Sequence, residues 1–396
     1  MADPQLLIEQ LKLVISRPDT YGTEEERHEI KRLGQLASNS LEAPFETMQR
    51  LVYSPLPLVA ARIGQDRELF STLARGQGST DLATLSCASG LEPRILESIM
   101  DYLCTQGMVV EAEIRRYAPT PLSRLLLAPI FNDAVTHFHD NCLPGFAAFH
   151  RVLKEPGNSW ADSLTAFKLG QHTDEDFYTW LETHPANQAA FHRFMEAQFA
   201  SLPTWLDVFD VKAELGCCGA GARPAAEVMF VDVGGGNGSQ CAGLRKAWPD
   251  MRGKMILQDK PQVLEKALGV EGMEKMGHDF LTEQPVKDAR AYYFRQIMHN
   301  FDDDTCITIL KAHLGAMDRH SVILIDDKVL PDEKPPADSP GVEYTAALSL
   351  AMKVMFDSME RRESHWRDLL RRAGLFIQYI RKFTKFDDAV IVAGKI

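Results

Sequence analysis

A glycine-rich stretch at residues 231–238 has the composition of a ligand-binding loop and reads Val-Asp-Val-Gly-Gly-Gly-Asn-Gly. It follows a Gly-x-Gly-x-Gly pattern from Gly234, and glycine lets the backbone adopt positive φ and approach a ligand without a Cβ in the way. The third glycine of a dinucleotide-binding fingerprint would fall at Ser239, so that fingerprint does not match. The loop can instead pass beside an amino-acid tail, whose amine Asp232 would help to neutralise.

Acidic residues also occur at the expected ends of the next two strands. Asp259 follows Gly238 by 21 positions, where a carboxylate can bind both hydroxyls of a ribose. Asp279 precedes Phe280, and this pair suits an adenine, because a carboxylate accepts from the exocyclic amine while an aromatic ring packs on the base. Each residue alone also fits a helix cap or a solvated strand end. Together they predict a nucleoside site at the carboxyl edge of an open α/β sheet.

Short apolar runs alternate with helical segments around these residues, which predicts a parallel α/β sheet. Strands are expected at 228–233, 255–258, 291–294 and 322–325. Helices are expected at 239–248, 261–268, 303–314 and 363–373. A hairpin of residues 376–383 and 389–393 is expected to close the sheet.

The N-terminal part, residues 1–127, has the rhythm of a winged helix. Its expected elements are helices at 66–74 and 91–106, an N-cap at 79–81, and wing strands at 108–112 and 116–119. This pattern alone suggests DNA recognition. The helix that would approach phosphates carries a net charge of −2, from Glu92, Arg94, Glu97 and Asp101. A dimerisation module is therefore favoured over DNA binding.

The middle part, residues 128–213, is predicted to be helical and is rich in aromatic residues. These are Phe131, Phe138, Phe146, Phe149, Trp160, Phe177, Trp180, Phe191 and Phe194. Most are expected to pack in the core, and some can line an apolar pocket. His137 and His139 lack an acidic partner at ligand spacing, so no metal site is expected there. The small residues of 214–227 mark a boundary, which makes residues 214–396 the catalytic domain.

Length, net charge and cysteine content further limit the classes of protein to which the chain can belong. A chain of 396 residues suggests two or three domains. Its net charge of −12 argues against nucleic acid as a partner and, more weakly, against anionic membranes. We find no secretory signal and no apolar run near the roughly 20 residues of a membrane span. Seven scattered cysteines favour a reducing, cytoplasmic location.

Residues 293–306 add a more specific pattern, Tyr-Phe-Arg-Gln-Ile-Met-His-Asn-Phe-Asp-Asp-Asp-Thr-Cys. This segment resembles the His-Asp-Trp…Asp…Cys segment of plant and fungal small-molecule O-methyltransferases of the caffeate/flavonoid type. The resemblance covers nearly the whole chain. It implies an α/β fold with a Rossmann-like sheet of the class I S-adenosyl-L-methionine (SAM) methyltransferases, an N-terminal winged-helix dimerisation domain and a helical substrate region.

The same resemblance implies which residues bind the cofactor. The SAM contacts would come from Gly234, Gly235, Gly236, Asp259, Asp279, Phe280 and Arg295, to which the composition of the glycine loop adds Asp232. The three glycines would contact the methionine part, and Arg295 would lie near the ribose and the carboxylate. No metal is implied.

The resemblance also implies catalytic residues. His299 matches the general base of the family, and Asp327 and Glu360 align with two glutamates that flank this histidine. The chain departs from the pattern at Asn300, where the family has aspartate, and at Phe301, where it has tryptophan. Asp327 is one methylene shorter than the glutamate of the family.

We therefore expect a homodimeric, SAM-dependent O-methyltransferase that methylates a phenolic hydroxyl of a small aromatic secondary metabolite. The alternative is a SAM-binding enzyme of the same fold that has been redirected to dehydration or pericyclic chemistry. The altered surroundings of His299 keep this alternative open. A transcription regulator is disfavoured by the acidic helix of the N-terminal part.

Overall fold

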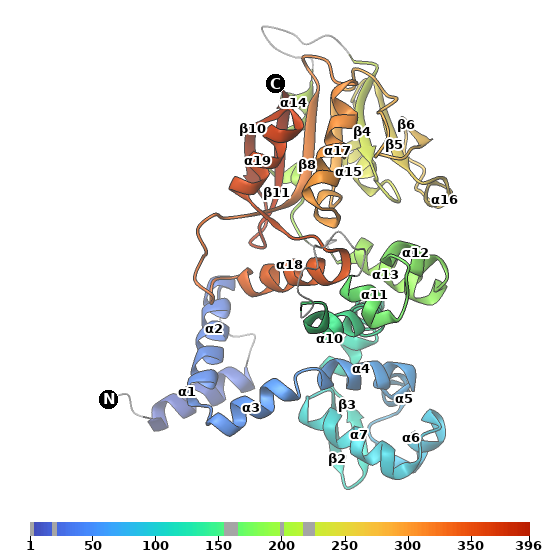
Figure 1. The fold of residues 1–396 in the computed structure, drawn as a ribbon. Helices are drawn as coiled ribbons and strands as arrows, with labels where there is room; N and C mark the ends of the chain where they lie inside the picture. The colour runs from blue at the N-terminus through green and yellow to red at the C-terminus, as the bar shows by residue number, and fades with distance from the viewer. Residues whose placement is uncertain (1–3, 18–21, 154–164, 199–201, 217–225) are drawn as a thin grey trace.

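The computed structural model describes residues 4–17, 22–153, 165–198, 202–216 and 226–396. Three layers are stacked along the molecule, with the N-terminal module at one end, a helical layer in the middle and the sheet domain at the other end (Figure 1). Trp160 and most of the predicted 214–227 boundary lie outside the described residues.

The sheet domain is built on a mixed sheet of strand order β10-β11-β8-β7-β4-β5-β6. The strands are β4 Val228–Val233, β5 Lys254–Asp259, β6 Met273–Gly277, β7 Ala291–Arg295, β8 Val322–Leu330, β10 Leu375–Lys382 and β11 Asp388–Lys395. All pairs from β8 to β6 are parallel, whereas β10 and β11 pair antiparallel. The inner strands are buried, as their near-continuous apolar runs predict. The predicted fold class is confirmed.

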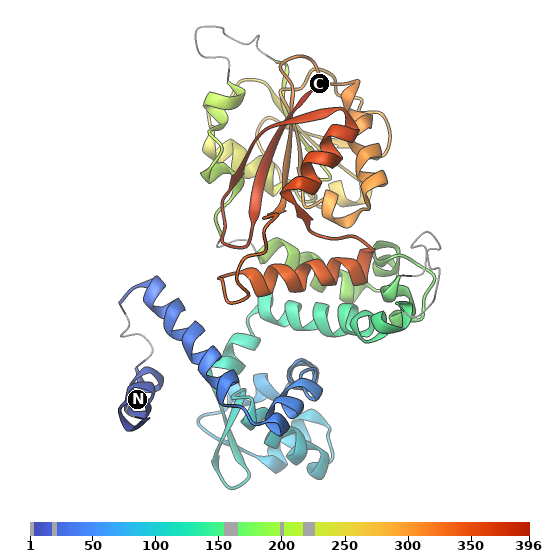
Figure 2. The same cartoon turned by 60° about the vertical axis from the view of Figure 1, so that its left-hand side comes forward.

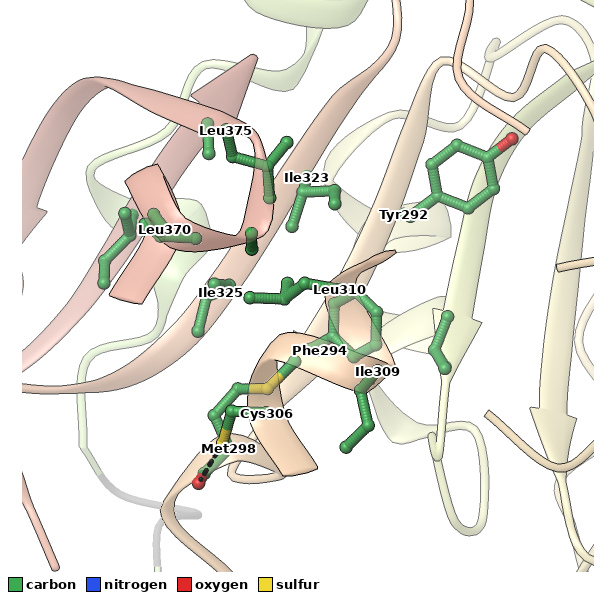
Figure 3. Packing of buried hydrophobic residues seen from close by; sticks show 14 of the residues in the cluster. Tyr292, Phe294, Met298, Cys306, Ile309, Leu310, Ile323, Ile325, Leu370 and Leu375 are labelled. Carbon is green, nitrogen blue, oxygen red and sulfur yellow. Dashed lines mark hydrogen bonds between the residues drawn. The ribbon is translucent and has the colours of Figure 1, made fainter. Parts of the chain in front are cut away.

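Helices cover the sheet, and buried side chains of the helices and strands form two hydrophobic clusters. The helices are α15 Ser239–Ala247, α16 Pro261–Leu264, α17 Asp303–Leu314 and α19 Glu363–Ala373. Figure 3 shows one cluster, in which Leu310 of α17 and Leu370 of α19 pack against Ile323 and Ile325 of β8. The other cluster includes Trp205, which precedes the predicted domain boundary. The division of the chain into 1–127, 128–213 and 214–396 stays a prediction.

Several predicted elements begin and end at the predicted residues because local signals mark them. Asp302 caps α17 by accepting from the backbone N–H of Thr305 at 2.7 Å. Gly374, with φ of 86°, ends α19.

Two predicted boundaries in the sheet domain were wrong. The helix expected at 261–268 ends at Leu264, and the backbone N–H of Leu268 instead donates to the carbonyl of Asn237. The strand expected at 322–325 continues to Leu330, because its polar residues are buried and pair with β11 and with β9 Arg361–Arg362. Sequence patterns treat such polar residues as exposed.

The N-terminal module has the predicted winged-helix order. Its elements are α4 Leu56–Asp66, α5 Leu69–Arg75, β1 Thr80–Asp81, α6 Leu82–Ser89, α7 Pro93–Thr105, β2 Val109–Glu113, β3 Arg116–Pro119 and α8 Pro121–Leu126. Asp81 caps α6, as expected. The helix expected at 66–74 was placed wrongly, because Asp66 ends α4 and Glu68 takes a left-handed conformation before α5 begins.

An N-terminal arm precedes this module and lies to one side of it (Figure 1). It consists of α1 Pro4–Ser16, α2 Glu24–Leu41 and α3 Pro44–Val52. Within the described residues, α1 and α3 contain no buried side chain. Helix α2 reaches the sheet domain, where Arg32 pairs with Asp338 and His28 Nε2 lies 3.0 Å from Lys385 Nζ.

The middle layer contains one helix that sequence patterns did not predict. Its elements are α9 Pro129–Thr136, the π-helix η2 His137–Cys142, α10 Leu143–Val152, α11 Ala166–Gln171, α12 Phe177–Glu182, α13 Pro185–Ala197 and α18 Val342–Phe356. Helix α18 comes from the C-terminal part of the chain and packs on α10 and α11 (Figure 2). It ties the middle layer to the sheet.

Candidate active site

The glycine loop links β4 to α15 at the carboxyl edge of the sheet. The backbone N–H groups of Gly234 and Gly235 donate to the carbonyl of Gln258, at 2.8 and 3.1 Å. Gly234 and Gly236 have φ of 67° and 59°, which glycine adopts readily. A Cβ on Gly234 would lie 2.7 Å from Ile297, whereas one on Gly236 would meet nothing within 4 Å. The loop is therefore packed against Ile297 at Gly234 and open at Gly236.

The predicted nucleoside residues gather beside this loop. Asp259 ends β5, and its Oδ2 accepts from the backbone N–H of Gly236 at 2.8 Å. Asp279 and Phe280 follow β6, and the ring of Phe280 lies close to Gly234. Asp259, Asp279 and Phe280 are all partly or fully exposed. They can therefore reach a ligand at this edge.

Asp232 lies beneath the loop rather than at the surface. Its side chain is fully buried, and a Cβ on Gly235 would lie 2.3 Å from its carboxyl carbon. Burial raises the pKa of Asp232 to about 7. Its Oδ1 finds no hydrogen-bond donor in the described part of the chain. A buried oxygen without a donor next to an open glycine loop fits a site that is completed by a bound ligand.

Arg295 ends β7 at the same edge and is partly exposed. Its Nε lies 3.8 Å from Oδ2 of Asp326, which accepts from the hydroxyl of Tyr293 at 2.5 Å. The Tyr293–Asp326 pair was not predicted, because it forms between neighbouring strands. Asp326 thereby gives the guanidinium of Arg295 a buried anionic partner.

A second unpredicted contact joins the loop to the middle layer. The side-chain amide of Asn237 donates to Oε1 of Glu196, from α13, at 2.7 Å. No local pattern marks Glu196, because the contact depends on how α13 approaches the sheet.

The three predicted catalytic residues meet next to this edge. His299 lies on the 3₁₀ turn η5 Met298–Asn300 and is 13% exposed. Its Nδ1 is 2.9 Å from Oε1 of Glu360 and 3.8 Å from Oδ1 of Asp327. Both carboxylate side chains are buried.

The electrostatics of this cluster favour a charged imidazole held by carboxylates. Burial lowers the pKa of His299, but the charges of Glu360 and Asp327 outweigh burial, so the pKa is raised. Burial raises the pKa of Asp327 to about 7. Because a carboxylate only accepts, the proton of a neutral His299 belongs on Nδ1 and the lone pair on Nε2.

The same three side chains have the chemistry of a cation site. One donor atom from each lies within 4.8 Å of the others. Oδ1 and Oδ2 of Asp327 and Oε2 of Glu360 accept no hydrogen bond from the residues that the structure describes. The absence of a metal stays a prediction.

Comparison with known proteins identifies the family of this chain. Residues 226–376 match the O-methyltransferase domain family, and residues 66–129 match the O-methyltransferase dimerisation domain family. The 16-O-methyltransferase bsc6 of Alternaria brassicicola is 32% identical over 98% of this chain and 96% of its own. Demethylsterigmatocystin 6-O-methyltransferase of Aspergillus parasiticus is 28% identical over 99% and 98%.

Solved structures with the same fold include the complex of LepI with SAM. It has a TM-score of 0.84 and 28% identity, and the match covers 100% of both chains. A structure described as a pericyclic reaction enzyme has a TM-score of 0.83 and 28% identity over 99% of this chain and 100% of that one.

The sheet order, the family match and the SAM-bound solved structure of the same fold define a class I methyltransferase fold that uses SAM. The chain belongs to the plant and fungal type of small-molecule O-methyltransferases, which are SAM-dependent. The predicted family, cofactor and enzyme class are confirmed. Among the helices that the structure describes, none is long and apolar enough to cross a membrane.

The raised pKa of His299 predicts a pH dependence of methyl transfer. If the neutral ring is the active form, activity is lost as the pH falls through this pKa. Glu360→Gln removes a negative neighbour, so we expect the acidic midpoint of the kcat–pH profile to move to lower pH. The measurement is kcat between about pH 5 and 9.

The matched control is Glu363→Gln, because Glu363 is a partly exposed residue that pairs with Arg367. Its acidic midpoint should equal that of the wild type. An unmoved midpoint in Glu360→Gln would contradict the assignment of the ionisation to His299.

Proposed function

We propose that this O-methyltransferase acts on a phenolic hydroxyl of a small aromatic metabolite, with His299 as the general base and Asp327 and Glu360 as its orienting carboxylates. The observation that carries the proposal is the 2.9 Å contact between Nδ1 of His299 and Glu360, beside the glycine-loop edge. This contact directs the basic Nε2 away from the carboxylates.

The cofactor residues of this proposal line the edge described above. Gly234, Gly235 and Gly236 border the methionine part, with Asp232 beneath them, and Arg295 lies near the carboxylate and the ribose. Asp259 binds the ribose hydroxyls. The adenine lies against Asp279 and Phe280. Bound SAM supplies an electrophilic methyl group.

The base must overcome an unfavourable proton transfer. A phenol has a pKa of about 10 and an imidazole about 6.5, so the full transfer costs roughly 5 kcal/mol. The two carboxylates reduce this cost, because they stabilise the imidazolium and thereby raise the pKa of His299. Glu360 also holds the ring in one tautomer, as the carboxylate does in hydrolase triads.

The acceptor class is supported by the middle layer. Partly buried aromatic residues pack against its core, among them Phe138, Phe149, Phe191 and Phe356. Apolar and aromatic linings suit flat aromatic ligands. The names of the relatives, a 16-O-methyltransferase and a demethylsterigmatocystin 6-O-methyltransferase, also support a small-molecule acceptor.

The second candidate function is SAM-assisted chemistry without methyl transfer. It is favoured by the similarity to a structure described as a pericyclic reaction enzyme, and by Asn300 and Phe301 beside His299. The contact of Glu360 with Nδ1, which leaves the lone pair of a neutral ring on Nε2, supports the base mechanism instead.

Turnover of a phenol panel separates the two functions. We expect the wild type to form S-adenosylhomocysteine together with a methylated phenol. His299→Ala should lose about 10²–10⁴-fold in kcat, because a positioned base contributes this much, and should bind SAM with unchanged affinity. Product formation and calorimetric SAM binding are the measurements.

The control is His150→Gln, since His150 is exposed on α10. Full activity of His299→Ala would disprove the base assignment. Conversion of an acceptor without S-adenosylhomocysteine would establish the second candidate function.

We further propose that the protein is a homodimer located in the cytoplasm. The dimerisation-domain match and the exposed apolar residues of the N-terminal arm support the dimer. Cys87, Cys104, Cys142, Cys241 and Cys306 are free thiols, which suits a reducing compartment.

Charges on the arm should weaken the dimer. Phe45 and Leu51 of α3 are 63% and 70% exposed, and covering such residues by a second copy removes apolar surface from water. We expect the double variant Phe45→Glu/Leu51→Glu to raise the dimer dissociation constant at least about tenfold, measured by analytical ultracentrifugation. Leu268→Glu, which changes a 45% exposed leucine in the sheet domain, should leave it unchanged. Equal dissociation constants for the two variants would exclude the arm from the interface.

A further inference from the structure

The turn that carries His299 is too short to be fixed in place by its own hydrogen bonds. η5 spans Met298–Asn300, and a 3₁₀ segment of this length has few internal hydrogen bonds. The backbone N–H of Asn300 donates to the carbonyl of Ile297 at 3.1 Å, and the backbone N–H of Phe301 donates to the carbonyl of Met298 at 3.2 Å. A fixed imidazole therefore needs contacts from outside the turn.

The guanidinium of Arg361 supplies these contacts on both sides of His299. Its Nη1 donates to the carbonyl of Met298 at 2.8 Å, and its Nη2 donates to the carbonyl of Phe301 at 2.7 Å. The side chain is 1% exposed. Because a guanidinium is planar and rigid, it holds the two carbonyls at a fixed spacing.

Neighbouring side chains fix the orientation of the buried guanidinium of Arg361. Its Nε donates to Oδ1 of Asp303 at 3.0 Å, and Oδ2 of Asp303 lies 2.6 Å from Nε2 of His365. The guanidinium carbon lies 5.4 Å from the ring centroid of Trp366. Such partners offset the desolvation of a buried cation and fix its orientation.

Arg361 also follows Glu360 directly in the chain. Glu360 contacts the ring of His299 through Nδ1, and Arg361 contacts the backbone before and after it. One short segment thus contacts the side chain of His299 and the main chain on either side of it. The contacts of Arg361 fix the position of the turn, and the contact of Glu360 fixes the orientation of the imidazole ring.

We propose that Arg361 is a positioning residue for His299, which holds the turn so that Nδ1 stays against Glu360 and Nε2 is presented to the acceptor. The proposal rests on the proposed function for the use of Nε2. The geometric part, that the guanidinium sets the contact between His299 and Glu360, stands without it.

Arg361→Lys tests the proposal because it keeps the charge and removes the planar fork. A single ammonium cannot reproduce the fixed contacts to two carbonyls and Asp303. The groups that act on the ring charge, Glu360, Asp327 and Lys328, are unchanged in this variant.

The readout is the titration of His299 by NMR of protein with ¹³Cε1-labelled histidine, assigned by the signal that disappears in His299→Gln. We expect the pKa of His299 to fall toward its ordinary value, because the contact with Glu360 loosens. SAM affinity should not change, and kcat for any phenol that the wild type methylates should fall about 10²-fold.

Arg362→Lys is the matched control, because Arg362 is the exposed neighbour that contacts the carbonyl of Pro331. Its His299 titration should equal that of the wild type. Should Arg361→Lys fail to fold, Asp303→Asn keeps Arg361 but weakens its anchor, and it should shift the titration in the same direction by less.

An unchanged titration of His299 in folded Arg361→Lys, or in Asp303→Asn if the first variant does not fold, would overturn the proposal. The ring titration needs no acceptor. A wild type that methylates no phenol would therefore count against the proposed function and not against this inference.

Discussion

The contact between His299 and Glu360, with Asp327 close by, is the interaction on which the site depends. Two carboxylates removed from water are unfavourable unless a positive charge accompanies them, and the imidazole supplies that charge when it is protonated. The pKa of His299 is therefore raised even though burial alone would lower it. A base of this kind is stabilised most after it has taken up a proton, which is when catalysis needs the stabilisation.

The fold accommodates these charges by extending β8 through a buried polar run. Asp326 accepts from Tyr293 at 2.5 Å, and the Nζ of Lys328 donates to Asp388 of β11 at 2.8 Å. The indole N–H of Trp366 donates to the carbonyl of Lys328 at 2.9 Å. Polar partners on both neighbouring strands thus hold Asp326 and Lys328, and Asp327 between them lies with its Oδ1 3.8 Å from Nδ1 of His299.

Local patterns were enough to predict the sheet and which residues lie together at its carboxyl edge. The glycine loop, Asp259 and the Asp279-Phe280 pair lie where strand ends and chain spacing placed them, because parallel strands bring their carboxyl ends to one edge. The His299 cluster was predicted only through family resemblance. Its members are separated by up to 61 positions, and no periodicity connects them.

What local patterns missed depends on contacts between distant segments. Helix α18 belongs to the middle layer through its packing on α10 and α11, which its own sequence does not show. Arg361 looks like a surface cation in sequence, and only its contacts with the turn of His299 show otherwise. Buried charged residues reverse the usual rule that polar positions face solvent, so β8 was predicted too short.

The tautomer of His299 tests the central claim most directly. It can be read from the ¹⁵N NMR shifts of the ring nitrogens above the pKa of this histidine, with the signals assigned by their loss in His299→Gln. The carboxylate contact at Nδ1 predicts a protonated Nδ1 and a bare Nε2. A ring that carries its proton on Nε2 would contradict the account, because its lone pair would then lie on Nδ1, against Glu360, and Nε2 could not take a proton from an acceptor.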